Sequence, residues 1–99
     1  MTIIKKMVEQ MSEEICSAKD YAEKYVEARA ENNAMWANRY KEMAQDELKH
    51  AKYTHDIAVE EVNKLKEVYK PTNEMMELWE RTHKEYVEKV AWIKVILAM

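Results

Sequence analysis

The chain contains no glycine and only one proline, Pro71, among its 99 residues. Glycine supplies the backbone freedom of tight turns, so its absence argues against hairpin-rich sheets and flexible linkers. Alanine, glutamate, lysine, methionine and valine are abundant, and 35% of the residues are charged, which is typical of long helices. A chain of this length forms one small domain, expected over residues 1–99.

Three helices are predicted, over residues 2–30, 34–69 and 73–98, with breaks at residues 31–33 and at Pro71. Asparagine, present at 32 and 33, tolerates the left-handed conformation that ends a helix and also caps the next one. The residue before a proline avoids helical geometry. A continuous helix through residues 31–33 is an alternative, although it would be unusually long. Short connections make successive helices antiparallel, so we expect an all-α, antiparallel three-helix bundle.

Each predicted helix carries an apolar stripe with steps of three and four residues, which indicates one buried face per helix. The last ten residues, 90–99, are almost entirely apolar apart from Lys94. This surface suggests a contact with a second copy, and a small chain gains a larger core from such association. We therefore expect a homo-oligomer that completes the core, and Met35 and Trp36 are candidate contacts for a protein partner.

The charge pattern and the cysteine content exclude several classes of partner. The net charge is −3, with both signs interspersed, and no basic stripe indicates a nucleic-acid partner. No apolar run approaches the length that spans a membrane, so no membrane partner is expected. The single cysteine, Cys16, rules out an internal disulfide and fits a reducing compartment. These observations predict a cytoplasmic protein.

Glu47 and His50 are the residues that most need a chemical explanation. They are three positions apart, so on a helix they lie on one face, and the apolar stripe indicates that this face points inward. Burial of an unpaired charge is costly, and a bound metal ion would offset that cost. A second Glu-x-x-His pair, Glu80 and His83, lies on the third predicted helix, and Glu14, Glu47 and Glu80 are equally spaced along the chain.

The positions of the turns decide which of these side chains can meet. The break at Asn32 is about midway between Glu14 and Glu47, so these two should lie level in an antiparallel hairpin. Pro71 is not midway between Glu47 and Glu80, which would be offset by about 15 residues, or roughly 22 Å. One site that includes both pairs therefore needs a longer connection between the helices or a second half from another chain.

Residues 14–51 resemble the first helical hairpin of the ferritin-like superfamily, rubrerythrin in particular. In that family a glutamate is followed, at about this separation, by Glu-x-x-His-Ala; here Glu14 is followed by ELKHA at residues 47–51. Glu80 and His83 resemble the motif of the family's fourth helix, whereas its third-helix glutamate has no clear match. The resemblance implies an iron or manganese centre, with iron oxidation, iron storage or peroxide reduction as its chemistry. The implied ligands are Glu14, Glu47, His50, Glu80 and His83.

A structural explanation of the same residues is also open. A glutamate three positions before a histidine arises readily by chance in a glutamate-rich chain, and such pairs also favour helix formation and solubility. Glu47 and His50 would then form a partly exposed pair, and His83 would be a histidine of the core. His55 and Asp56 are expected at the solvated surface. Under this structural explanation of Glu47, His50 and His83, the protein is a small helical interaction or oligomerisation module without catalytic activity.

Overall fold

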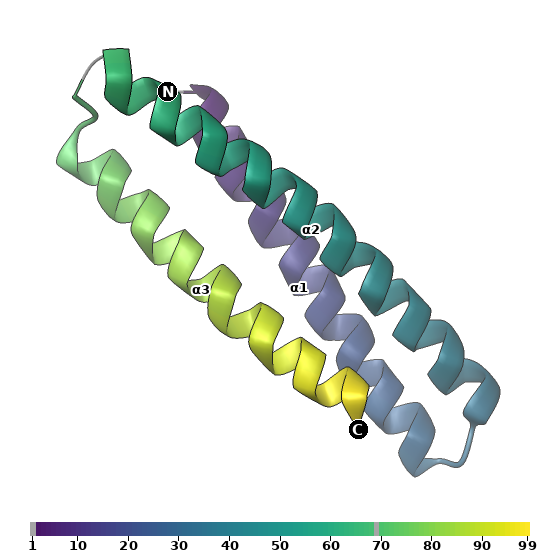
Figure 1. Ribbon diagram of the computed structural model, residues 1–99. Helices are drawn as coiled ribbons and strands as arrows, with labels where there is room; N and C mark the ends of the chain where they lie inside the picture. The colour runs from purple at the N-terminus through teal and green to yellow at the C-terminus, as the bar shows by residue number, and fades with distance from the viewer. Residues whose placement is uncertain (1, 69) are drawn as a thin grey trace.

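The computed structural model of the protein describes residues 2–68 and 70–99, and this part of the chain contains three α-helices and no strand. The helices are α1 (Thr2–Ala30), α2 (Ala34–Val68) and α3 (Asn73–Ala98). Successive helices run antiparallel, so α1 and α3 point in the same direction, in an elongated bundle (Figure 1) that measures 54 × 18 × 17 Å. The limits of α1 and α3 coincide with the expected ranges, and Tyr69, the last residue of the predicted second helix, lies outside the described residues.

The connection between α1 and α2 is a tight turn built on two asparagines. Asn32 has a φ of 58°, in the left-handed region that asparagine tolerates better than most residues. The N–H groups of Asn32 and Asn33 donate to the carbonyls of Arg29 and Ala28, at 3.0 and 2.8 Å, in the Schellman arrangement that closes a helix. The Oδ1 of Asn33 then accepts from the N–H of Trp36 at 3.2 Å and caps α2. Asparagine therefore performs here the role that glycine usually has.

The connection between α2 and α3 follows the rules for proline and threonine. Pro71 stands between the two helices, and Thr72 is the N-cap of α3 with an extended backbone. The Oγ1 of Thr72 accepts from the N–H of Met75 at 3.3 Å. This bond satisfies one of the backbone donors that are otherwise left unpaired at the start of a helix.

The tightest packing is between α1 and α2. The buried stripe of α1 consists of Ile4, Val8, Met11, Ile15, Ala18, Ala22, Tyr25 and Ala28. The facing stripe of α2 is mostly alanine, and Ala44, Ala51 and Ala58, seven residues apart, are fully buried. Because helix separation depends on the side chains at the contact, these small residues let the two backbones approach closely.

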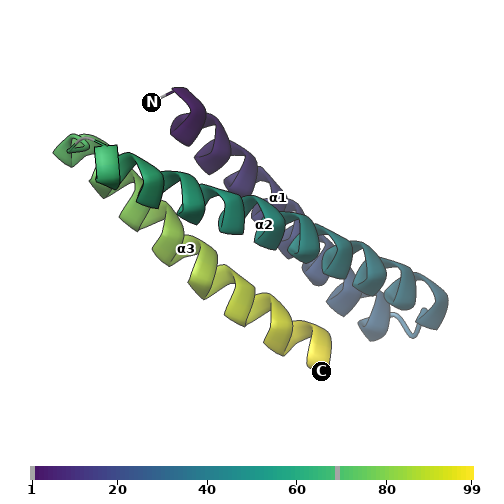
Figure 2. The same cartoon turned by 45° about the horizontal axis from the view of Figure 1, so that its top comes forward.

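The third helix packs on one side of this hairpin, and it lies closer to α1 than to α2. Figures 1 and 2 show α3 alongside the hairpin, with its C-terminal end short of the α1–α2 turn. Its buried residues are Trp79, Thr82, Tyr86, Ile93 and Leu97. His83, which the structural explanation of the sequence placed in the core, lies half-buried at the edge of this stripe, and its neighbour Thr82 is the buried residue.

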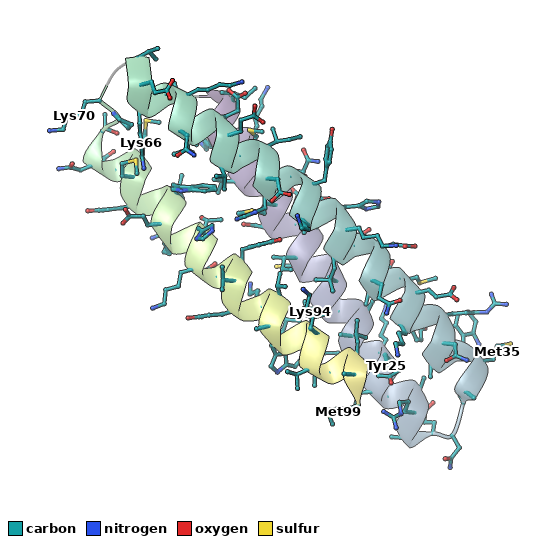
Figure 3. The ribbon with its side chains drawn as sticks, in the orientation of Figure 1. Tyr25, Met35, Lys66, Lys70, Lys94 and Met99 are labelled. Atoms are coloured by element: carbon teal, nitrogen blue, oxygen red, sulfur yellow. The ribbon has the colours of Figure 1, made fainter. Side chains whose placement is uncertain are left out.

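The outer side of the C-terminal half of α3 carries exposed apolar side chains. Trp92, Val95 and Met99 are 41%, 63% and 68% exposed, and Figure 3 shows Met99 at the end of α3. Such a face is a candidate contact surface, as expected from the sequence. None of the three helices, over the residues described, has the length and apolar character needed to cross a membrane.

Candidate metal centre

Three of the candidate ligands converge on the surface of the α1–α2 hairpin. Glu14 projects from α1, and Glu47 and His50 project from α2; each offers a ligand atom, and these atoms all lie within 4.8 Å of one another. Glu14 and Glu47 are half-buried, whereas the side chain of His50 is 63% exposed. A cluster of this kind is accessible to an ion from solvent while its two carboxylates are partly shielded.

The convergence follows from the geometry of the hairpin. The turn at Asn32 lies about midway between Glu14 and Glu47, so the two glutamates face each other across the helix pair. His50 follows Glu47 by one helical turn and points to the same side, with its Nδ1 3.6 Å from the Oε1 of Glu47. Ala51, fully buried beside them, keeps the helices close enough for the side chains to meet.

The two neighbouring carboxylates of the cluster have few basic partners. Among the described residues, no lysine or arginine forms an ion pair with Glu14 or Glu47, and His50 is the only basic group within ion-pair distance of Glu47. Two carboxylates held close together repel each other, and a single imidazole offsets this repulsion only when it is protonated. A cation at this position would remove that repulsion.

Thr54 lies beside the three converging donors, in a role that the helical pattern did not predict. Its Oγ1 donates to the Oε1 of Glu14 at 2.7 Å and accepts from the Nε2 of Gln10 at 3.5 Å. Thr54 is the only buried polar residue of α2, four positions after His50 in a stripe that is otherwise alanine and valine. A single hydroxyl in such a stripe is the sequence signal that could have pointed to it.

The second Glu-x-x-His pair does not join this cluster within one chain. Glu80 is exposed, and the ring of His83 lies against the ring of His55, with centroids 5.0 Å apart. His55 also stacks on Tyr86, so α3 is aligned with α2 in the register of a tight hairpin about Pro71. In this register Glu80 is about 14 residues from the level of Glu47, or roughly 20 Å along the bundle. The structure thus brings together three of the five predicted ligands.

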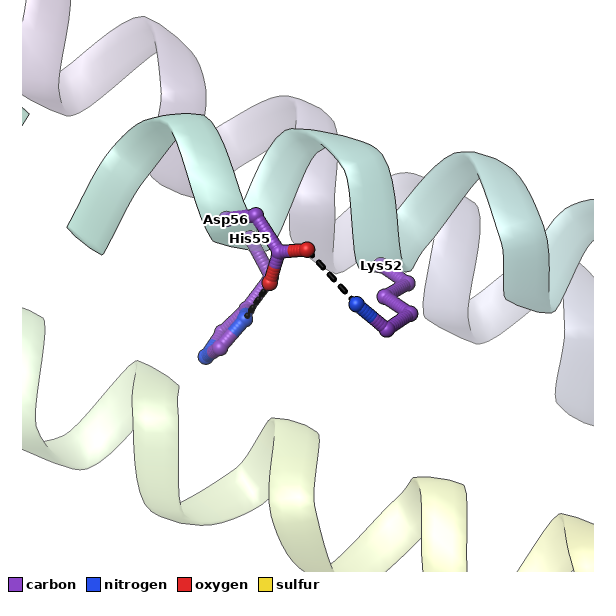
Figure 4. Close-up of polar contacts among 3 residues, drawn as sticks. All are labelled: Lys52, His55 and Asp56. Atoms are coloured by element: carbon purple, nitrogen blue, oxygen red, sulfur yellow. Dashed lines mark hydrogen bonds and ion pairs between the residues drawn. The ribbon is translucent and has the colours of Figure 1, made fainter. Parts of the chain in front are cut away.

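His55 lies between α2 and α3 rather than at the solvated surface, which corrects the sequence-based expectation. Its side chain is 17% exposed, and its ring is 4.4 Å from the ring of Tyr86 and nearly parallel to it. The Oδ1 of Asp56 accepts from its Nδ1 at 3.1 Å, and the Oδ2 of Asp56 accepts from the Nζ of Lys52 at 2.7 Å (Figure 4). The Nε2 of His55 is buried without a hydrogen-bond partner among the described residues.

The charges of this second cluster support one another. The hydrogen bond from Lys52, followed by the one from His55, lowers the pKa of Asp56, and the bond to Asp56 raises the pKa of Lys52. An ionised Asp56 can only accept, so the proton of the neutral His55 ring lies on Nδ1. These hydrogen bonds orient the ring of His55 so that it stacks on the aromatic residues of α3, and this stacking holds α3 against α2.

Alkaline solution should weaken this contact through Tyr86. Burial, and secondly the negative charge of Asp56, raises the pKa of Tyr86 above its ordinary value of 10.0. The contribution of the neutral Tyr86 side chain to the free energy of unfolding is therefore complete below pH 10, and it is lost as the pH rises through the raised pKa of Tyr86. Urea unfolding between pH 8 and 11.5 should show a smaller loss of unfolding free energy for Tyr86→Phe than for the wild type. Equal losses in the two proteins would contradict this assignment.

Oxygen and nitrogen donors of the kind gathered at Glu14, Glu47 and His50 suit iron and manganese. Three protein donors leave several coordination positions open for water or for ligands from elsewhere. Comparison of the chain with models of protein families, with curated proteins and with solved structures finds no match. The chemistry of the site is therefore inferred from the residues themselves.

Proposed function

We propose that this protein binds iron or manganese through Glu14, Glu47 and His50, in a carboxylate site of the ferritin-like kind. The observation that carries the proposal is the convergence of the three donors within 4.8 Å from two different helices. Two features support it: the carboxylates lack a lysine or arginine partner among the described residues, and the donors lie on a hairpin whose spacing is fixed by buried alanines.

The proposed site is completed by a second copy of the chain. Carboxylate sites with two metal ions in four-helix bundles use one glutamate from each of two helices and Glu-x-x-His from each of the other two. One α1–α2 hairpin supplies Glu14 and the pair Glu47 and His50, which is one half of that set. A second hairpin related by a two-fold axis supplies the same half again.

The surface around the donors is free to receive this second hairpin. Cys16 and His55 contact Lys89 and Tyr86 of α3. Glu14 is two residues from Cys16, and because successive residues on a helix are rotated by about 100°, it points to nearly the opposite side of α1. The donor side of the hairpin, which also bears the partly exposed Met43, is therefore the side that α3 leaves uncovered.

The chemistry that we propose for the loaded site is the oxidation of ferrous iron by dioxygen or by peroxide; two ferrous ions would supply the two electrons that reduce one peroxide to water. Glu14, Glu47 and His50 would hold the metal, which would supply the redox chemistry, and charged carboxylate donors would favour its higher oxidation state. The part played by the protein is to hold the donors in place and to leave the remaining coordination positions accessible. The resemblance of residues 14–51 to the ferritin-like hairpin supports this choice among the reactions of such metals.

Anaerobic titration of the metal-free protein with ferrous iron, and separately with Mn²⁺, tests the proposal. We expect one ion per chain and, by sedimentation equilibrium, the mass of a dimer at saturation. The absence of binding for both ions would overturn the metal-binding proposal. Binding by a protein that stays monomeric at saturation would keep the metal site and overturn its completion by a second copy.

The exposed side of α3 favours a second candidate function, that of a helical interaction module. Trp92 and Val95 are 41% and 63% exposed on this side, where Lys19 of α1 lies over part of the Trp92 ring, and tryptophan is enriched among the residues that dominate binding energies. The same titration separates the two functions, because an interaction module has no need for the donors at Glu47 and His50. If the protein is an interaction module, Trp92→Ala would weaken its association with the partner and leave its affinity for metal ions unchanged.

A further inference from the structure

We infer that Thr54 is a positioning residue for the metal centre, holding the carboxylate of Glu14 in the orientation that binds the ion. This inference rests on the proposed function, because it concerns the same site. Thr54 is itself 5% exposed, so its hydroxyl does not act through solvent. It touches Glu14 and Gln10, both on α1, and it does not belong to the three converging donors.

The direction of the hydrogen bond defines what the hydroxyl does. An ionised carboxylate has no proton to give, so Thr54 donates to the Oε1 of Glu14, and the 2.7 Å separation is that of a charge-assisted bond. The oxygen of the same hydroxyl accepts from Gln10, at the long distance of 3.5 Å. Because a carboxylate has about four lone-pair positions, this bond occupies one of them and leaves the rest for an ion.

The bond is not needed to satisfy the hydroxyl. A threonine inside a helix can donate to the carbonyl four residues before it, a local partner that requires no neighbouring helix. Thr54 instead reaches across to α1, over a separation of 40 residues in sequence. The result is a fixed link between the helix that carries Glu14 and the helix that carries Glu47 and His50. The structure thus assigns to Thr54 the same task that outer carboxylates and carbonyls have at known metal sites.

Two substitutions at Thr54 separate positioning from packing. Thr54→Val keeps the shape and removes the hydroxyl, and Thr54→Ser keeps the hydroxyl and removes a methyl group. Loss of a positioning partner typically lowers metal affinity by about 10- to 100-fold, and we expect this for Thr54→Val in a titration with Mn²⁺ followed by electron paramagnetic resonance. Thr54→Ser should bind within about threefold of the wild type, because the hydroxyl that orients Glu14 is retained.

The matched control is Thr82→Val, at a second threonine that is buried in the described part of the chain; it lies on α3 and is 7% exposed. It should leave the Mn²⁺ affinity unchanged. Thermal unfolding of the metal-free proteins shows whether each variant is folded. If Thr54→Val binds Mn²⁺ with wild-type affinity, the inference is overturned and the metal site stands. The same conclusion follows if Thr54→Val loses no more Mn²⁺ affinity than Thr82→Val, or no more than Thr54→Ser. A wild-type protein that binds no Mn²⁺ would overturn the proposed function and the inference together.

Discussion

Glu47→Gln should lower the affinity for Mn²⁺ by about 100-fold or more, whereas Glu80→Gln should leave it unchanged. Both residues are the glutamate of a Glu-x-x-His pair, so the two substitutions make the same chemical change in the same motif. Only Glu47 lies among the converging donors; Glu80 is exposed on α3. Glutamine keeps the size of the side chain but removes the negative charge, and hard cations such as Mn²⁺ depend on charged oxygen donors.

His50→Ala and His83→Ala form the corresponding pair for the imidazoles. His50→Ala removes the nitrogen donor and should reduce both the affinity and the number of ions bound at saturation. His83 contacts Trp79 and His55 in the α2–α3 interface, so its replacement should reduce stability with no effect on binding. Isothermal titration at one pH measures all four variants. Equal effects of Glu47→Gln and Glu80→Gln would show that the centre is not confined to the α1–α2 hairpin.

Met11→Ala should lower the free energy of unfolding by about 2–5 kcal/mol, the range for truncation of a fully buried methionine. Met11 is 0% exposed and is one of the two largest fully buried side chains. A domain of this size has a total stability of about 5–15 kcal/mol, so the loss is a large part of it. Urea unfolding followed by circular dichroism at 222 nm measures the change.

Met35→Ala is the control for this substitution. Met35 is 57% exposed at the α1–α2 turn (Figure 3), so the same truncation should change the stability by no more than about 0.5 kcal/mol. A loss at Met35 as large as the loss at Met11 would mean that the turn is covered in solution, for example by another copy of the chain. Sedimentation equilibrium of the same samples would then reveal that copy.

The fold was predictable because local signals agree along the whole chain. Asn32 and Pro71 mark the two places where a helix has to end, and the apolar steps of each helix identify one inner face. With two short connections, three helices have few ways to bury those faces. The orientation of α3 about its own axis was harder to predict, because Thr82 and His83 are neighbours and either could lie in the buried stripe. Packing against α1 decides between them, and helical periodicity does not contain that information.

The candidate site was predictable only where its residues share one hairpin. Glu14 and Glu47 are related by a single turn whose position the sequence specifies, so their levels follow from counting residues. Glu80 and His83 match the motif equally well, but the register about Pro71 separates them from the other donors. The roles of Thr54 and His55 were missed because both depend on contacts across helices. A hydroxyl next to Glu14, and a ring beneath Tyr86, leave no periodic signature in α2.

The alanines that face α1 have a consequence for the ions that the hairpin would accept. Ala44 and Ala51 stand one turn to either side of Glu47 and are fully buried. Alanine has no rotatable side chain, so the gap between the two backbones cannot be widened by a change of rotamer there. Adjustment to ions of different radius would therefore come from rotation of the glutamate and histidine side chains. The two helix backbones are thus held at a fixed distance, whereas the donor side chains can move. Selectivity among metals of similar charge would be set by the type of donor atom rather than by the size of the cavity.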